Sequence, residues 1–507
     1  MNLMMLLEMA ASGFGERVAV VNEDQRLTYA ELFRAAGAAA DAIAASGAKH
    51  AAILDVSSLA LPIGLFGAAW AGVPFVPLNY RLTGAELDRL VSQIEPAHLV
   101  TDADRARALG GRSGVAPVAR EDFIARARSG DARSAEWSME GEDIAILLFT
   151  SGTTGPPKAA VLRHRHLVSY ILGSVEFGAA SEEDAALVSV PPYHVAGMAA
   201  LASSVYSGRR IVQLPSFSAE AWLDAARNER VTHAFVVPTM LARIVDVLEG
   251  QGGARLPHLR SLSYGGGKMP LSVIERAMRL FPDADFTNAY GLTETSSTLT
   301  VLTPDDHRAA AASDDPAVRR RLTSVGRPLP AVEIEVRDED GRPVAVGVSG
   351  EICVRGEQVS GEYRGLASRV GTDGFFPTRD AGSLDTEGYV FLEGRIDDII
   401  VRGGENMSPG EIEDVLLAHP AVADCAVVGV PDEQWGETVA AVVVPKPGAA
   451  PTPEVLREFV ARQLRSSRAP ARIEFREELP YNETGKLLRR EVRAWLAELK
   501  GDSEGPR

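Results

Sequence analysis

IAILLFTSGTTGPPK, residues 144–158, joins a continuous apolar run to a loop of glycine and small hydroxyl-bearing residues. An apolar run of this length, bounded by a turn signal, predicts a buried strand. In the loop, small side chains let backbone N–H groups and hydroxyls close around phosphate oxygens, and Lys158 adds a positive charge. No G-x-x-x-x-G-K-[ST] spacing runs through it, so it is not a Walker A loop. The stretch predicts a strand followed by a phosphate-binding loop, with an ordinary surface turn as the alternative.

Apolar runs alternate with helical patterns on both sides of this stretch. Thr28 and Glu31 supply the two halves of a capping box, which predicts the start of an Ala-rich amphipathic helix. Further apolar runs are IVQLP, THAFVVP and LRSLSYGGG, each separated from the next by a helical pattern. Strands separated by helices predict a layered α/β fold with largely parallel sheets.

The pattern changes from about residue 325. Short β-type runs broken by turn signals follow, namely VEIEVRD, GEICVRG and YVFLEGR, and they predict a β-rich subdomain over residues 325–395. Beyond it, helices and strands alternate over about 110 residues, which is enough for a small independent α+β domain. We therefore expect an N-terminal domain over residues 1–395 and a C-terminal domain over residues 396–507.

Composition narrows the class of protein. The chain has 507 residues, 46% of them hydrophobic, which is too long for one ordinary domain. Its net charge of -17 offers no basic footprint for nucleic acid. The sequence lacks both an apolar stretch of about 18 residues and a basic secretory leader. Cys353 and Cys425 lie in apolar stretches and should be buried, reduced thiols. We expect a soluble, cytoplasmic protein without nucleic-acid partners or integral membrane association.

Further motifs follow the loop in a fixed order. They are PPYHVAG (191–197), NAYGLTET (288–295), PTRDAG (377–382), EGRIDD (393–398), RGGENMSPGEIE (402–413) and YNETGKLLRR (481–490). With TSGTTGPPK, this order resembles the adenylate-forming superfamily of acyl-CoA synthetases, luciferases and peptide-synthetase adenylation domains. The resemblance runs from about residue 15 to about residue 495. It implies a large N-terminal domain of layered α/β subdomains, a β-rich subdomain and a small mobile C-terminal domain.

The resemblance also implies a nucleotide site. Its ATP- and AMP-binding positions are Thr150, Ser151, Gly152, Thr153, Thr154, Gly155, Lys158, Gly266, Asn288, Ala289, Tyr290, Gly291, Asp380 and Arg395. Glu294 would hold Mg²⁺, for which one protein carboxylate suffices because the ion keeps water and substrate phosphates in its shell. The implied catalytic residues are His194, Thr293, Glu294 and Lys486, and Lys486 would reach into the site for adenylate formation.

Other motif positions imply an acyl pocket and a moving domain. The acyl pocket would be lined by Tyr193, Val195, Phe235, Val236, Ser263, Tyr264, Gly265, Gly266 and Lys268. Asp397 matches the hinge about which the C-terminal domain rotates. Gly403, Gly404 and Glu405 would then border the tunnel for the thiol of coenzyme A.

Two positions depart from the family pattern. The residue before Asp380 is usually glycine, and here it is Arg379. Lys268 stands where the family usually has an uncharged residue. Two interpretations of Lys268 are open: a contact to a second carboxylate or other polar substituent of the acid, or an exposed lysine at the start of the following helix.

The implied activity uses ATP and Mg²⁺ to convert a fatty or aromatic acid into acyl-AMP with release of pyrophosphate, and then transfers the acyl group to coenzyme A. A stand-alone adenylating enzyme that serves a carrier-protein pantetheine or an amine is the first alternative. A catalytically silent nucleotide-binding protein is the second, and retention of Glu294, Asp380, Arg395 and Lys486 argues against it. Expected partners are the acid, ATP and coenzyme A, with an acyl carrier protein in the first alternative, and the protein would be a monomer or homodimer.

Overall fold

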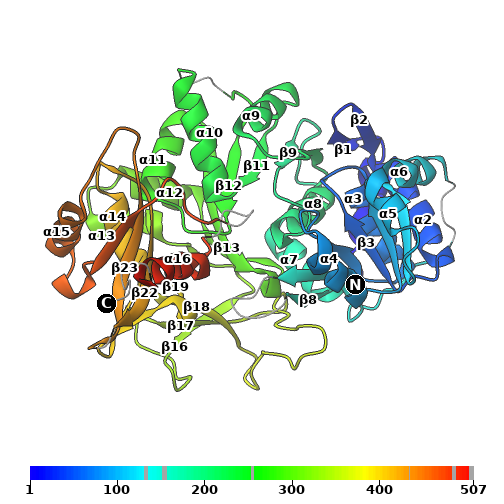
Figure 1. The fold of residues 1–507 in the computed structure, drawn as a ribbon. Coiled ribbons are helices and arrows are strands. Elements are labelled where there is room, and N and C mark those ends of the chain that lie inside the picture. Colours follow the sequence, from blue (N-terminus) through cyan, green and yellow to red (C-terminus); the bar gives the residue numbers. More distant parts are fainter. Residues whose placement is uncertain (131–134, 151–156, 253–255, 433, 482–486, 502–507) are drawn as a thin grey trace.

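The computed structural model describes residues 1–130, 135–150, 157–252, 256–432, 434–481 and 487–501. Figure 1 shows sheets with helices packed on their faces through the blue and green parts of the chain, a sheet in the yellow part, and an orange and red C-terminal part. The predicted α/β fold class is confirmed. No described helix has both the length and the apolar character that crossing a membrane requires.

The largest sheet has the strand order β15-β14-β13-β12-β11-β9-β10-β1-β2. Its strands are β1 (Val18–Asn22), β2 (Gln25–Thr28), β9 (Ala185–Val188), β10 (Arg210–Gln213), β11 (His233–Val236), β12 (Ser261–Gly265), β13 (Asp285–Leu292), β14 (Ser297–Leu302) and β15 (Arg327–Pro328). The six central strands pair in parallel, namely β13, β12, β11, β9, β10 and β1, whereas β2, β14 and β15 pair antiparallel at the edges. The parallel centre follows from the alternation of strand and helix in the sequence.

A second sheet has the order β6-β5-β3-β4-β7-β8. Its strands are β3 (His50–Leu54), β4 (Phe75–Pro77), β5 (Ala97–Thr101), β6 (Val115–Ala119), β7 (Ile144–Thr150) and β8 (Lys158–Arg163). β7 is the strand that the run IAILLFT predicts. It pairs antiparallel with β8, and Thr150 lies opposite Lys158. The two ends of the predicted phosphate loop are therefore held together by a strand pair.

Helices cover these sheets. Their bounds are α1 (Met4–Phe14), α2 (Tyr29–Ala45), α3 (Ala60–Ala71), α4 (Gly84–Gln93), α5 (Ala103–Leu109), α6 (Arg120–Ser129), α7 (His164–Ser174), α8 (Val195–Ser207), α9 (Ala219–Asn228), α10 (Pro238–Gly250), α11 (Leu271–Leu280), α12 (Pro304–Ala312) and α13 (Pro316–Arg319). α2 begins with the predicted capping box: the Thr28 hydroxyl accepts the N–H of Glu31, and the Glu31 carboxylate accepts the N–H of Thr28 at 2.8 Å.

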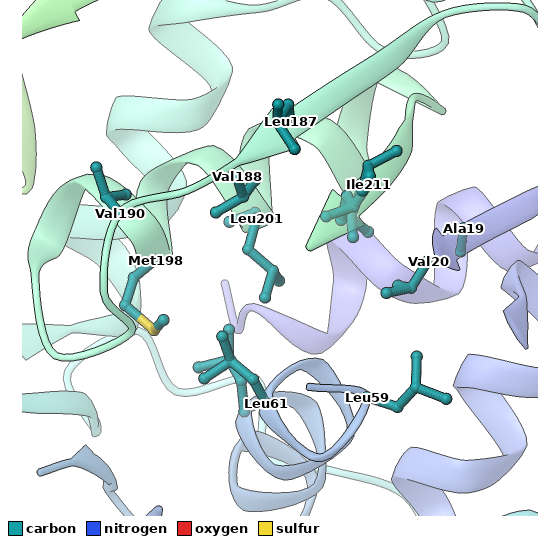
Figure 2. Packing of buried hydrophobic residues seen from close by; sticks show 14 of the residues in the cluster. Ala19, Val20, Leu59, Leu61, Leu187, Val188, Val190, Met198, Leu201 and Ile211 are labelled. Atoms are coloured by element: carbon teal, nitrogen blue, oxygen red, sulfur yellow. The ribbon is translucent and has the colours of Figure 1, made fainter. Parts of the chain in front are cut away.

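One core joins the two sheets. In Figure 2, Leu61 at the start of α3 points toward Met198 and Leu201 of α8, beneath β9 and β10. α3 is apolar on all sides, and nearly all its residues are buried, as expected of a helix enclosed by other elements. Both sheets therefore pack on one shared core.

The β-rich region forms a third sheet, of order β16-β17-β18-β19. Its strands are β16 (Glu333–Arg337), β17 (Gly350–Arg355), β18 (Phe376–Leu384) and β19 (Val390–Arg395), and all neighbours pair antiparallel. Cys353 on β17 is buried, and so is Cys425 in the next sheet; both are free thiols.

The C-terminal domain has a sheet of its own. Its elements are β20 (Ile400–Arg402), β21 (Glu405–Met407), α14 (Pro409–Leu417), β22 (Val422–Asp432), β23 (Gly436–Pro445), α15 (Pro453–Gln463), β24 (Arg472–Phe475) and α16 (Arg489–Gly501). Alternate residues of β22 face opposite sides: Val427 packs in a core with α14 and α15, and Val428 packs in a core with α16. Buried faces on both sides of one sheet give this domain two small apolar cores distinct from the large one.

Candidate active site

Several motif residues meet at one edge of the large sheet. Parallel strands end at the same edge, where ligands of open α/β sheets usually bind. His194 follows β9 and caps the start of α8, while Gly266 directly follows β12. Tyr290 lies near the end of β13, and a short 3₁₀ turn, Thr293–Thr295, continues from that strand. Segments about a hundred residues apart in the sequence thus contribute to one site.

Asp380 links the large sheet to the β-rich sheet. It lies opposite Arg395 in the β18–β19 pair, and Arg395 Nη1 donates to Asp380 Oδ1 at 2.8 Å. The Tyr290 hydroxyl donates to Asp380 Oδ2 at 2.7 Å. Tyr290 and Asp380 are buried, being 8% and 7% exposed. Burial, reinforced by Asp380, raises the pKa of Tyr290 well above its usual value, so its phenol remains a donor.

Arg395 keeps its charge in this partly enclosed setting. Burial opposes the charge, but Asp380, together with Tyr290 and Glu294, outweighs burial and raises the pKa of the guanidinium. Its Nε is buried and has no hydrogen-bond partner among the described residues. A cation with a spare donor beside a carboxylate suits a ligand that carries both hydroxyl groups and negative charge.

Glu294 lies at the other end of the same cluster. The Tyr363 hydroxyl donates to Glu294 Oε1, and the Glu294 carbonyl accepts the N–H groups of Ser360 and Gly361 at 2.8 and 3.2 Å. Burial and then Glu294 raise the pKa of Tyr363, so this phenol also stays protonated. Lys158 Nζ lies 5.9 Å from the centre of the Tyr363 ring. Glu294 therefore stands close to the exit of the predicted phosphate loop.

The arrangement fits a magnesium ion held mainly by phosphates. No group of three or more His, Cys, Asp and Glu side chains gathers among the described residues. A hard dication bound with nucleotide typically uses one or two carboxylates and completes its shell with phosphate and water oxygens. Glu294, fixed by Tyr363 and facing the Lys158 side, is a suitable single ligand.

The Tyr193–His194 pair forms an aromatic wall. The two rings lie 4.6 Å apart, and Tyr80 packs edge-on against Tyr193 at 5.6 Å. Burial, assisted by the charge of Arg81, lowers the pKa of His194 to about 4. Its Nε2 is buried without a hydrogen-bond partner in the described chain. The imidazole is thus neutral at ordinary pH, and its Nε2 is available for a hydrogen bond to a ligand.

Strand alternation divides the predicted acyl-pocket residues between two faces. Phe235 pairs with Ser263, and a Cβ on the neighbouring Gly265 would lie 3.6 Å from the Phe235 ring, so these residues share one face. Val236 and Tyr264 pair on the opposite face, and the buried Tyr264 hydroxyl bonds to His307 Nε2 of α12 at 2.8 Å. We therefore assign Val236 and Tyr264 to the core, because adjacent residues of a strand point to opposite sides.

Two further predicted nucleotide contacts prove to have structural partners. Asn288 is buried, and its Nδ2 donates to the carbonyl of Ser324 at 3.0 Å. Gly291 allows β14 to approach: a Cβ there would lie 1.5 Å from the Ser297 carbonyl oxygen. Asn288 thus ties β13 to the segment that follows α13, and Gly291 permits the close pairing of β13 with β14, structural roles that no local sequence signal distinguishes from ligand contact.

Several predictions fall where the structure gives no information. Ser151, Gly152, Thr153, Thr154 and Gly155 of the loop, and Lys486, lie outside the described residues. Thr150 and Lys158, at the two ends of the loop, are described and pair across β7 and β8.

The predicted hinge residue Asp397 contacts the β-rich sheet, whereas the predicted thiol-tunnel residues contact their own domain. Arg379 Nη2 donates to Asp397 Oδ1, next to the Asp380–Arg395 pair. Gly403 faces the Trp435 ring of its own domain, and Glu405 lies 3.7 Å from Arg468. Lys268, predicted in the acyl pocket, donates to the C-terminal domain. Tyr363 was not predicted at all, because nothing in the motif order marks it.

Comparisons with known proteins identify the family of the chain. The sequence profile described as AMP-binding enzyme matches residues 7–364, and the profile described as AMP-binding enzyme C-terminal domain matches residues 411–486. A fatty acid–[acyl-carrier-protein] ligase, ScoC of Streptomyces coeruleorubidus, is 35% identical over 94% of this chain and 92% of its own. A feruloyl-CoA synthase of Amycolatopsis sp is 33% identical over 92% and 93% of the two chains.

Solved structures match over nearly the whole chain. The o-succinylbenzoate CoA synthetase MenE of Bacillus subtilis, in complex with its acyl-adenylate intermediate, has a TM-score of 0.83 at 30% identity and covers 96% of this chain and 97% of its own. ATP-bound MatB of Rhodopseudomonas palustris has a TM-score of 0.86 at 27% identity, covering 98% and 100%. The chain belongs to the AMP-binding enzyme family, and the predicted adenylate-forming superfamily is confirmed.

Proposed function

We propose that this protein uses ATP to activate a carboxylic acid as acyl-AMP and then transfers the acyl group to the thiol of coenzyme A. The observation that carries the proposal is the pair of clusters at the edge of the large sheet. Asp380, held by Tyr290 and Arg395, stands at one end, and Glu294, held by Tyr363, stands at the other. The first suits the hydroxyls of a ribose and the second suits a metal-bound phosphate chain.

Adenylate formation brings together two anions, so the site must orient them and neutralise their charge. A carboxylate oxygen of the acid forms a bond to the α-phosphorus, while the bond from that phosphorus to the bridging oxygen breaks and pyrophosphate leaves with the electron pair. Asp380 would accept the ribose hydroxyls, and Arg395 Nε offers a donor toward the nucleotide. Mg²⁺ on Glu294 would supply positive charge for the leaving pyrophosphate. Lys486 would bridge the acid and the α-phosphate.

Thioester formation needs a different arrangement of the same groups. The thiol sulfur forms a bond to the acyl carbon, and the bond from that carbon to the phosphate oxygen breaks, so that AMP leaves and the thiol proton passes to solvent. Rotation about Asp397 would withdraw Lys486 and bring the Gly403 loop to the site. Such domain movements commonly limit turnover.

The acid is expected to be a fatty or aromatic one. Tyr80, Tyr193 and Phe235 supply apolar rings beside the neutral His194. The relatives ScoC and feruloyl-CoA synthase are named for a fatty acid and for an aromatic acid. A carrier-protein pantetheine is the second candidate acceptor, favoured by the name of ScoC.

Pyrophosphate exchange into ATP tests the first half-reaction. The purified protein is offered fatty acids of increasing chain length, ferulate and succinylbenzoate, each with Mg²⁺. We expect acid-dependent exchange with at least one of these acids, and exchange with none would overturn the proposal. The preferred acid is then offered with coenzyme A and a pantetheinylated carrier protein in competition. If product forms faster with the carrier protein, the carrier protein and not coenzyme A is the acceptor.

A further inference from the structure

Two residues in the N-terminal domain break the family pattern, and both contact the C-terminal domain or the hinge. Lys268 follows β12, and Arg379 lies on β18. The residues they bind, Asp414 and Asp397, belong to α14 and to the hinge turn. The two departures from the pattern thus share one location, the junction between the domains.

Lys268 binds one face of α14 at two points. Its Nζ donates to the carbonyl oxygen of Gly410 at 3.0 Å and to Asp414 Oδ2 at 2.7 Å. Gly410 and Asp414 are four residues apart, so they lie one above the other on the helix surface. The lysine and aspartate side chains are 42% and 50% exposed. The contact therefore joins the domains at a partly exposed edge, where water can replace either partner of the ion pair.

Arg379 is held in a backbone conformation that favours glycine. Its φ is +66°, in the left-handed region where the Cβ of an L-residue crowds the following carbonyl. Its N–H donates to Glu351 Oε1 at 2.9 Å, and its guanidinium reaches Asp397. A glycine would adopt this conformation without strain but would leave Asp397 without this partner. The arginine thus gains the ion pair at the cost of strain that glycine avoids.

Two consecutive acidic residues of the hinge form ion pairs with different domains. Asp397 pairs with Arg379 of the N-terminal domain. Asp398 pairs with Arg489 and Arg493 of α16, at 3.7 and 3.1 Å, within the C-terminal domain. Rotation at this point would separate Arg379 from Asp397 and leave the Asp398 pairs intact.

The likeness to an ATP-bound structure over both domains favours the adenylating arrangement of the proposed mechanism for the orientation seen here. The match to ATP-bound MatB extends over 98% of this chain, both domains included. A cleft of about 1380 Å³ separates the β-rich sheet from the C-terminal domain, with Lys268, Arg379 and Asp414 in its walls. The domains therefore touch through separate contacts and not through a continuous apolar face.

We propose that Lys268 and Arg379 are positioning residues. Their ion pairs hold the C-terminal domain in the orientation for adenylate formation and break before thioester formation. The inference rests on the proposed function. Half-exposed ion pairs shift an equilibrium by about 2- to 5-fold each, which is enough to bias an orientation without locking it. At two positions where the family usually has uncharged residues, this chain has cations whose ion pairs form in this orientation.

The two half-reactions are measured separately for Lys268→Ala, Arg379→Gly and the double variant. Each single change should slow adenylate formation by about 2- to 5-fold and the double change by about tenfold. Thioester formation from supplied acyl-adenylate should not slow. Lys268→Arg, which keeps the charge, should retain most of the adenylation rate. Equal losses in both half-reactions, or no loss in either, would overturn the proposal.

Matched variants separate positioning from general stability. Arg355→Ala removes an ion pair with Glu333 of similar exposure, but within the β-rich sheet, and should change neither half-reaction. Arg379→Gly relieves the backbone strain and should not lower the melting temperature. A purely structural role for Arg379 would instead lower the melting temperature and slow both steps.

A distance measurement tests the same inference without any turnover. Spin labels are attached to Glu220→Cys on α9 and Glu458→Cys on α15; both residues are exposed, whereas the native Cys353 and Cys425 are buried. We expect a narrow distance distribution with ATP bound and a broader one in the double variant. An unchanged distribution would refute the positioning role. Absence of acid-dependent exchange in the parent protein would refute the proposed function instead, and the distances would still decide whether the contacts hold the domain.

Discussion

Arg379 and Asp380 are neighbours on β18, and each makes an ion pair, but the two pairs differ in solvation. Asp380 and Arg395 have side chains 10% and 27% exposed, and the buried Tyr290 hydroxyl adds a third member. The side chains of Arg379 and Asp397 are 39% and 41% exposed. The strand is irregular here, with Arg379 at a φ of +66°, and the adjacent side chains reach different partners: Asp380 contacts Tyr290 at the predicted nucleotide site, and Arg379 contacts Asp397 at the predicted hinge.

The difference in burial gives the pairs different tasks. Removing one member of a buried pair leaves a charge without water or partner, so such a pair is expensive to break and holds a fixed geometry. A half-exposed pair exchanges its partner for water at small cost. The first is suited to hold a ribose through both half-reactions, and the second is suited to a contact that forms and breaks once in each cycle.

The largest expected effect comes from a group delivered by the moving domain. Lys486→Ala should slow adenylate formation by about 1000-fold, or about 4 kcal/mol, because a charge is lost between two anions. Thioester formation from supplied acyl-adenylate should be spared. Both half-reactions are followed by rapid quench. If both fell equally, the assignment of Lys486 to one domain orientation would be wrong.

Asp380→Ala tests the buried side of the comparison. It leaves Arg395 and the Tyr290 hydroxyl unpaired in a desolvated setting, so the free energy of unfolding should fall by about 3 kcal/mol and the KM for ATP should rise. Asp397→Ala is the matched control on the exposed side and should cost about 1 kcal/mol or less. Urea unfolding of the two variants measures both values. Similar losses would show that burial does not separate the pairs.

Acid should weaken the buried regions through histidines that the fold keeps neutral. Burial, assisted by Arg165 and Arg163, lowers the pKa of His166 to about 3, and its Nδ1 accepts the Arg163 N–H. The unfolded chain takes up this proton below about pH 6.5 and the folded chain does not, so stability falls as the pH drops below 6.5 and is unaffected above it. Between pH 7 and pH 5 the loss should be about 2 kcal/mol.

His166→Asn provides the comparison for the acid effect. Asparagine keeps an acceptor for the Arg163 N–H but does not titrate. Urea unfolding at both pH values should show a pH dependence smaller by about 2 kcal/mol in this variant. An identical pH dependence in the two proteins would exclude His166 as a source.

The smallest expected effect concerns Tyr363, whose hydroxyl orients the predicted Mg²⁺ ligand Glu294. Tyr363→Phe removes the hydroxyl that fixes Glu294 and should raise the Mg²⁺ concentration for half-maximal activity by about tenfold, since groups that orient a metal ligand commonly contribute that much. Adenylate formation is titrated with Mg²⁺. Tyr290→Phe serves as the control, because its hydroxyl binds Asp380, and should leave the Mg²⁺ requirement unchanged.

Local patterns predicted the elements well. The capping box at Thr28 and Glu31 is formed, and the run IAILLFT is β7. These features depend on residues a few positions apart, and so the sequence shows them directly. The motif order in turn brought Asp380, Arg395 and Tyr290 together as candidates, and the structure joins them through hydrogen bonds.

Side-chain direction is what the motifs do not specify. Tyr264 and Asn288 stand inside motifs, and in the structure the Tyr264 hydroxyl bonds to His307 and Asn288 Nδ2 donates to the carbonyl of Ser324, while their predicted ligand contacts stay predictions. A motif specifies which residues occur together, but the strand register decides which face each one takes. Tyr363 could not be found because its partner Glu294 is 69 residues away, at a spacing with no periodic signal.

The sequence by itself determined the family and the alternation of strands and helices, and it named candidate residues for a nucleotide site, because motifs and periodicity lie in neighbouring positions. Only the tertiary structure decided that Asp380 is buried against Tyr290, and that Lys268 and Arg379 reach across to α14 and the hinge. The reason is physical: burial and ion pairing depend on which distant segments pack together, and residues 268 and 414 meet only after two domains have formed.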